Sequence, residues 1–180
     1  MLFFGIAREW ERHAIFRLGK FQRMAGPGLY FYIPVIDRCL FRIDTRIVTY
    51  EVPLQQGLTR DNIPVEVDAI VFYQVKSPKS AVLEVDDYHQ ATQLSARSAI
   101  RDMVGRSTLD ELLSERDQIG KRVKGHVDGF VAQWGVTVLG VEIKDVVVSK
   151  ELEDAVSREA AAPTPALRSA ASQTISLLVR

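Results

Sequence analysis

The sequence predicts an α+β fold, in which a twisted antiparallel sheet is followed by helices. Up to about residue 75, apolar and polar side chains tend to alternate with the period of two that is typical of strands. From Ser77 to Trp134 apolar residues recur every three to four positions, which indicates helices. Thr137–Val148 returns to a strand pattern, and Ser149 begins a last expected helix.

The first sixty residues are rich in strand signals separated by turns. The expected strands are His13 to Leu18, Leu29 to Ile36, and Cys39 to Val52. Gly26-Pro27-Gly28 is a strong turn signal, and Pro53 is expected to end the third strand. Because a polar turn at Thr59-Arg60-Asp61-Asn62 precedes the next strand, we expect a hairpin there.

The stretch from Ile63 to Val75 has the clearest strand pattern. Glu66 and Asp68 point to one face, and Ile70 and Phe72 make that face apolar further on, so we expect that end to be covered on both sides. The residues of the other parity form the predicted core face: Ile63, Val65, Val67, Ala69, Val71, Tyr73 and Val75.

Capping residues mark the expected helices. The predicted starts are Ser77-Pro78, Asp87 with Gln90, Thr108 with Glu111, and Ser114 with Asp117. Gly105 and Gly135 are the predicted stops of the second and fourth helices. The helix from Glu115 to Trp134 carries one apolar stripe: Ile119, Val123, Val127, Phe130, Val131 and Trp134. Its glycines, Gly120, Gly125 and Gly129, are either tolerated or allow close approach of another helix or protomer.

Composition excludes several classes of protein. The 180 residues carry a formal net charge of zero, which argues against a nucleic-acid binder. Cys39 is the only cysteine, so an intrachain disulfide is impossible, and no zinc-binding spacing is present. The N-terminal apolar run stops at Arg8, so it is too short for a membrane span, and it lacks the basic start and the cleavage site of a signal peptide. It is either the remnant of a longer anchor or a disordered start with some hydrophobic residues.

Long stretches of the chain resemble the SPFH/Band 7 domain of stomatin-like (slipin, prohibitin-homology) proteins. Ile15-Phe16-Arg17-Leu18-Gly19 and Gly26-Pro27-Gly28-Leu29 are similar to the family's opening. Leu58 to Ala69 is similar to its central hairpin, and Leu109 to Arg116 to its helical half. Val141-Glu142-Ile143-Lys144-Asp145-Val146 is similar to its final strand. The resemblance divides the chain into an apolar stub (1–7), an SPFH domain (8–160) and a tail (161–180) that we expect to be mostly disordered.

The resemblance implies a non-catalytic, membrane-associated scaffold without cofactors. Such proteins form homo-oligomers and organise or regulate channels or a membrane-bound protease. Two departures concern the ends: only seven residues precede Arg8, and after about Ala160 Pro163 and Pro165 prevent the family's coiled coil. We therefore expect peripheral membrane attachment and small oligomers. The rivals are a soluble binding module derived from a truncated stomatin-like protein and, with less support, a hydrolase.

The candidate membrane contacts are apolar residues in two segments. They are Leu2, Phe3, Phe4 and Ile6 near the start, and Leu29, Tyr30 and Phe31 after the Gly-Pro-Gly turn. Apolar and aromatic side chains can enter the interface of a bilayer without crossing it. The second segment, however, has the composition of a buried strand, and both interpretations stay open.

Other reactive residues have structural explanations. Asp86, Asp87 and His89 could suggest a metal or acid–base group, but helix capping alone accounts for the two acids. The sequence has no Gly-x-Ser-x-Gly elbow, and Gly26-Pro27-Gly28 lacks the Lys-Ser/Thr of a phosphate loop. Cys39 is interpreted as a small buried hydrophobe, with lipid attachment as an alternative.

Overall fold

The computed structural model describes residues 3–148, apart from the side chains of Phe3 and Leu40. The expected helix after Ser149 and the expected disorder of the tail lie outside these residues. The strands and helices are, in chain order, β1 (Phe3–Ala7), β2 (Glu11–Arg17), β3 (Lys20–Ala25), β4 (Gly28–Tyr32), β5 (Asp37–Asp44), β6 (Ile47–Leu58), β7 (Pro64–Val75), α1 (Pro78–Leu83), α2 (Tyr88–Arg106), α3 (Leu109–Ser114), α4 (Arg116–Val131), a 3₁₀ turn (Ala132–Trp134) and β8 (Val136–Val148). Antiparallel strands are followed by helices and a final strand, which confirms the predicted fold class.

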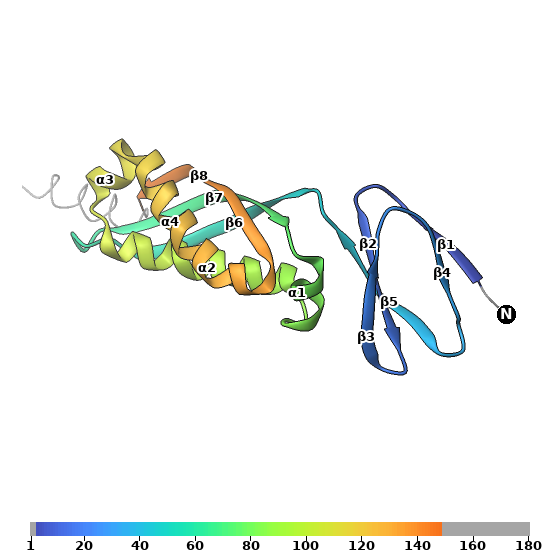
Figure 1. The fold of residues 1–180 in the computed structure, drawn as a ribbon. Coiled ribbons are helices and arrows are strands. Elements are labelled where there is room, and N and C mark those ends of the chain that lie inside the picture. Colours follow the sequence, from blue (N-terminus) through green and yellow to red (C-terminus); the bar gives the residue numbers. More distant parts are fainter. Residues whose placement is uncertain (1–2, 149–180) are drawn as a thin grey trace, which may run out of the picture.

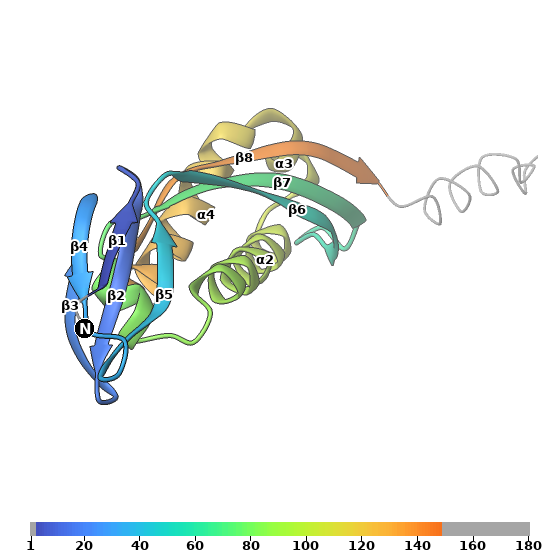
Figure 2. The same ribbon diagram turned by 90° about the vertical axis from the view of Figure 1, so that its right-hand side faces the viewer.

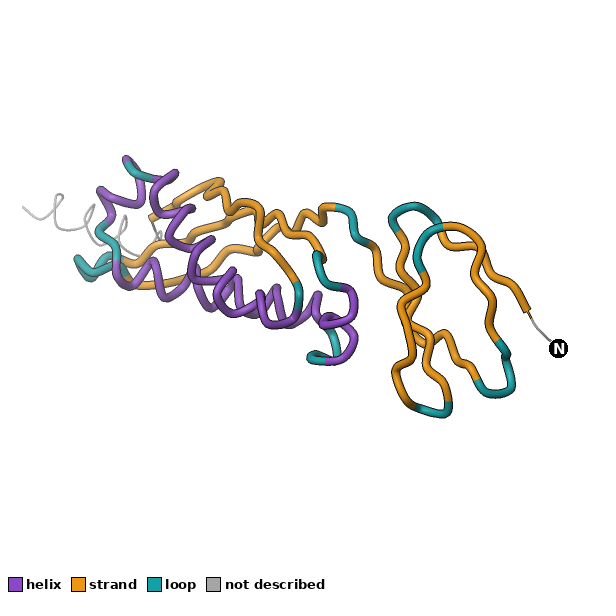
Figure 3. Tube along the Cα trace, viewed as in Figure 1, coloured by secondary structure: helices purple, strands orange, loops and turns teal. Residues whose placement is uncertain are grey.

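The strands form three antiparallel sheets. β1 and β4 make a two-stranded ribbon, and β3, β2 and β5 make a three-stranded sheet in that order. These two sheets lie together at one end of the molecule, away from the long helices (Figure 1). The third sheet has the order β6-β7-β8, and α2 and α4 lie along one of its faces (Figures 2 and 3).

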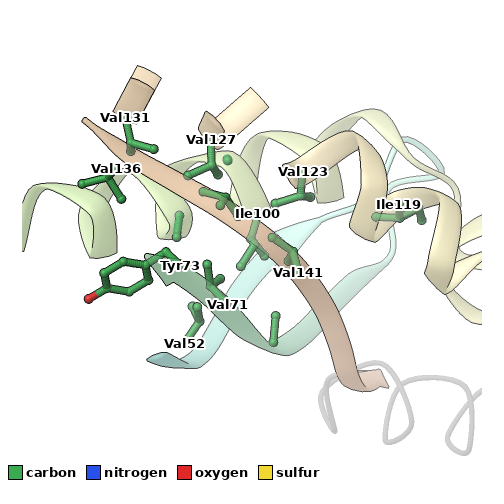
Figure 4. Close-up of a cluster of buried hydrophobic side chains, with 14 of the residues drawn as sticks. Val52, Val71, Tyr73, Ile100, Ile119, Val123, Val127, Val131, Val136 and Val141 are labelled. Atoms are coloured by element: carbon green, nitrogen blue, oxygen red, sulfur yellow. The ribbon is translucent and has the colours of Figure 1, made fainter. Parts of the chain in front are cut away.

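Strand β7 is the centre of the hydrophobic core. Its residues alternate strictly between buried and half-buried, with Val67 and Val71 among the buried ones, as the sequence predicts. The buried face of β7 packs against the apolar stripes of α2 and α4, where Ile100 and Val127 lie (Figure 4). The opposite face carries no helix, and Ile70 and Phe72 there are only half-buried, so the expected cover on both sides is wrong within the described chain.

Most of the predicted helix boundaries are confirmed by cap geometry. The Asp87 side chain accepts hydrogen bonds from the backbone N–H groups of His89 and Gln90. Thr108 and Glu111 form a reciprocal capping box at the start of α3. Gly135 ends the last helical turn with φ of 70°, a conformation that glycine adopts without strain.

Two predicted helix boundaries are wrong. Gly105 lies inside α2, which continues to Arg106, because the glycine takes an ordinary helical conformation there. Ser114 is the last residue of α3, and its hydroxyl donates to the carbonyl of Asp110 instead of capping α4. At the C-terminal end of α4, Phe130 points away from the core and is exposed, although it belonged to the predicted stripe.

Two predictions about the strands are also wrong. The stretch expected as one strand from Cys39 to Val52 is interrupted at Thr45 and Arg46, which separate β5 from β6. Pro53 does not end β6, because the register against β7 shifts between Val52 and Gln55 and gives β6 one extra residue. At such a bulge the backbone nitrogen of the residue does not have to donate a hydrogen bond to the neighbouring strand. Proline, which has no N–H group, is therefore tolerated there.

The glycines of α4 have different surroundings. A Cβ atom built on Gly120 would collide with the carbonyl oxygen of Val141, so this glycine lets α4 approach β8. A Cβ atom on Gly125 or Gly129 would meet nothing within 4 Å. Gly120 therefore serves contact with a strand of the same chain, not with another helix.

We expect Gly120→Ala to destabilise the domain and Gly125→Ala to stabilise it. The first change pushes a methyl group into the backbone of β8, at a cost of about 1–3 kcal/mol. The second replaces glycine in an open helix interior, with a gain of about 0.5–1 kcal/mol. Urea unfolding of the two variants measures both effects, and equal midpoints would contradict the close packing of α4 on β8.

Candidate membrane-contact surface

The β1–β4 ribbon brings the two candidate segments together. In its antiparallel register Phe4 faces Phe31, and Ile6 faces Leu29. These four side chains have the same parity, so they lie on one face of the ribbon, which we call the outer face. The sequence predicted the residues but did not predict that the two segments pair.

The outer face is exposed. The exposed fractions are 68% for Phe4, 75% for Ile6, 59% for Leu29 and 48% for Phe31. Four large apolar side chains side by side on one face make this surface a candidate for contact with a membrane or a partner. The buried-strand interpretation of Leu29 to Ile33 therefore does not describe Leu29 and Phe31, although the strand itself forms.

The inner face of the ribbon is held against the three-stranded sheet. Tyr30 lies opposite Gly5, and its ring takes the space that a side chain at Gly5 would fill, since a Cβ there would be 2.5 Å from the ring. The Tyr30 hydroxyl lies 3.3 Å from Nδ1 of His13, and burial raises the pKa of Tyr30. Tyr30 thus lies on the inner face and holds the ribbon against the sheet. Ala7 lies on the same face and is buried.

Polar contacts fix the ribbon and the loop that follows it. Arg23 of β3 donates from Nη2 to the carbonyl of Phe31 at 2.8 Å. Arg17 donates from Nε and Nη2 to the two carboxylate oxygens of Asp37, at 2.7 and 3.1 Å, and Asp37 also accepts from the backbone N–H of Ile33 at 3.1 Å. The Arg17 hydrogen bond, followed by that from Ile33, lowers the pKa of Asp37.

Two further exposed apolar residues lie at loop tips at this end of the molecule. Leu18 and Val35 are 79% and 90% exposed, and the backbone N–H of Leu18 donates to the carbonyl of Ile36, which joins the two loops. Neither residue is among the membrane contacts predicted from the sequence. The available signal was an apolar side chain at a turn, with Leu18 directly before Gly19 and Val35 directly after Pro34.

The sequence of this chain is similar to those of known proteins. The SPFH domain / Band 7 family matches residues 6–173. The chain belongs to the SPFH/Band 7 family. A stomatin homolog of Pyrococcus horikoshii is 40% identical over 157 residues, which are 87% of this chain and 59% of that protein. Human stomatin-like protein 3 is 40% identical over 159 residues, 87% of this chain and 54% of that protein.

The matched region covers only part of the length of these relatives. A protein of Archaeoglobus fulgidus is 42% identical over 157 residues, and the matched part is 63% of its length. The chain therefore spans roughly three-fifths of the length of the Archaeoglobus and Pyrococcus relatives. Stomatin homologues are typically membrane-associated and generally non-catalytic. Among the described helices, none combines the length and apolar character needed to cross a bilayer.

The remaining candidate residues of this SPFH/Band 7 protein occupy different places. Leu2 lies outside the described residues, and for Phe3 only the backbone, in β1 opposite Tyr32, is described. Asp87 caps α2. Nδ1 of His89 lies 2.8 Å from the hydroxyl oxygen of Tyr73. Within residues 3–148 no three His, Cys, Asp or Glu side chains are grouped as metal ligands would be.

Cys39 is exposed, contrary to the expectation of a buried residue. The register between β2 and β5 shifts at this point, because Ala14 faces Phe41 whereas Ile15 faces Cys39. β5 therefore carries one extra residue, and this bulge changes the face to which Cys39 points. The prediction that Cys39 is buried assumed a strand without a bulge.

We expect the Asp37–Arg17 contact to make the stability of the domain depend on acid pH. The pKa of Asp37 is lowered in the folded state, so its contribution is complete above the ordinary aspartate value of about 3.9. That contribution is lost as the pH falls below this value through the lower folded pKa.

Thermal unfolding of Asp37→Asn at several pH values tests this. At neutral pH the variant should melt below the parent protein, and the difference should shrink as the pH falls below about 4. Exposed Asp86, changed to Asn, is the control. A difference that stays constant down to the lowest pH would contradict the role of the Asp37 carboxylate.

Proposed function

We propose that this protein is a non-catalytic scaffold that rests on a membrane surface, self-associates, and organises or regulates other membrane proteins such as channels or a membrane-bound protease. The observation that carries the membrane part is the outer face of the β1–β4 ribbon, where Phe4, Ile6, Leu29 and Phe31 are exposed together. Membership of the SPFH/Band 7 family supports the scaffold part.

The position of the outer face suits contact with a flat surface. The ribbon lies at one end of the molecule, whereas β8 ends at the opposite end (Figure 1). A bilayer that touches the ribbon therefore leaves the helical half free.

The size of the outer face predicts weak and reversible attachment. Full burial of one such side chain contributes about 1.5–3 kcal/mol, so four that are half to three-quarters exposed contribute on the order of 5 kcal/mol. Association of a single chain must offset lost translational freedom, as for proteins held by one acyl chain. Self-association would place several such faces on one membrane and increase the overall affinity without any new contact.

We expect vesicle flotation to depend on the ribbon. The variant with Phe4→Ser and Phe31→Ser removes two aromatic side chains from the outer face, so its partitioning onto phosphatidylcholine–phosphatidylserine vesicles should fall by about tenfold or more. The matched control carries Leu94→Ser and Phe130→Ser, which are similarly exposed but lie on α2 and α4. The parent and the control should float alike.

Other results would point elsewhere. Equal flotation of the two double variants would refute the ribbon as the contact surface. If the parent protein floats on no lipid mixture, the soluble binding module is the better description.

We also expect small oligomers that form without residues 161–180. Pro163 and Pro165 block a continuous helix in that part of the sequence, so a coiled coil cannot drive assembly there. Light scattering on the whole chain and on residues 1–160 should give the same small oligomeric mass. A large particle from the whole chain that dissociates on truncation would show that the tail assembles the protein.

A further inference from the structure

A reactive group that the scaffold function does not use lies behind the ribbon. Sγ of Cys39 on β5 is 3.3 Å from Nδ1 of His13 on β2. The Tyr30 hydroxyl contacts the same nitrogen at 3.3 Å and also hydrogen-bonds with Cys39. Thiol, imidazole and phenol thus meet where the ribbon packs on the three-stranded sheet.

A carboxylate lies on the other side of the imidazole. Nε2 of His13 is 3.5 Å from Oε2 of Glu11, whose side chain is only 6% exposed. Nε2 is buried and has no hydrogen-bond partner in the described structure. Burial alone would raise the pKa of Glu11, but the hydrogen bond from the Arg8 backbone, the neighbouring His13 and the charges of Arg42 and Arg8 lower it overall, so the carboxylate is ionised at neutral pH.

The order of these groups is that of an activated nucleophile. A thiol is adjacent to a base, and a negatively charged group lies on the far side of that base, 3.5 Å from its other nitrogen. A proton that passes from Sγ to Nδ1 makes an imidazolium, whose Nε2–H then faces the Glu11 carboxylate. The bulge in β5 points the exposed thiol at His13, and bulges are often found beside active residues.

We propose that Cys39 is a site of reversible modification by small disulfides such as glutathione disulfide, with His13 as its base and Glu11 as the group that orients His13. The Cys39 sulfur attacks one sulfur of the disulfide, the disulfide bond breaks, and a mixed disulfide forms. The thiol proton moves to Nδ1 of His13 and then to the leaving thiolate, which departs as a thiol. No other oxidant is required.

The base matters because the thiol is not acidic by itself. Partial burial raises the pKa of Cys39, and the hydrogen bond with Tyr30 offsets only part of this effect. A free thiolate is therefore scarce at neutral pH, and reactivity depends on proton transfer to His13. This property is independent of the membrane proposal and is measured without vesicles.

The test uses the whole chain, which contains a single cysteine, so intact mass reports one site. The rate of glutathione adduct formation is compared between His13→Gln and the control His126→Gln, which changes an exposed histidine on α4. Removal of the base should slow the reaction by about tenfold or more, and the control should react like the parent. Thermal unfolding verifies that each variant is folded.

A second comparison needs no variant. The folded parent should react about tenfold faster than the same chain unfolded in urea, because only the folded chain places His13 beside Cys39. Equal rates for His13→Gln and His126→Gln, or a folded chain that reacts no faster than the unfolded one, would overturn the proposal. If His13→Gln does not fold, the comparison of folded and unfolded parent decides alone.

Discussion

The burial of one face of β7 is the constraint on which the larger half of the molecule depends. β7 pairs with β6 on one side and β8 on the other, so it fixes the register of both neighbours. A shift of one residue would exchange Val67 and Val71 for Glu66 and Ile70 on the core face, and burial of the charge would be costly. The same face also positions the helices, because α2 and α4 bury their apolar stripes against it.

The N-terminal sheets are stabilised differently. Their buried residues include the acids Glu11 and Asp37, each paired with arginine: Glu11 with Arg8 and Arg42, and Asp37 with Arg17. A buried carboxylate is tolerated only when such partners remain. This half therefore combines a small apolar core, which includes Ile15 and Ile43, with buried ion pairs.

The sequence predicted regular elements well, because local signals specify them. The parity of β7, the capping box at Thr108 and the glycine stop at Gly135 can each be recognised from neighbouring residues. Prediction from the sequence failed where a contact between distant segments decides the local structure. Pro53 is accommodated by a bulge against β7, and Gly120 is needed because β8 passes close to α4.

The candidate membrane-contact surface was likewise predictable only in part. The composition of Leu29 to Phe31 indicated apolar contact but could not distinguish a buried strand from an exposed one. The distinction comes from pairing with β1, which aligns Phe4 and Ile6 with Phe31 and Leu29 on one outer face. For Cys39 the expectation of burial was wrong because a bulge in β5, invisible to alternation, changes the direction of the side chain.

Tyr30 connects the two features that the structure adds. On β4 it separates the exposed neighbours Leu29 and Phe31, and its ring lies over Gly5 and holds the ribbon to the sheet. Its hydroxyl contacts the same His13 nitrogen as the Cys39 thiol does. A group attached to Cys39 would lie beside the Tyr30 hydroxyl and compete with it for Nδ1 of His13. The inner side of the ribbon would then respond to the state of the thiol, while the outer face keeps its apolar residues.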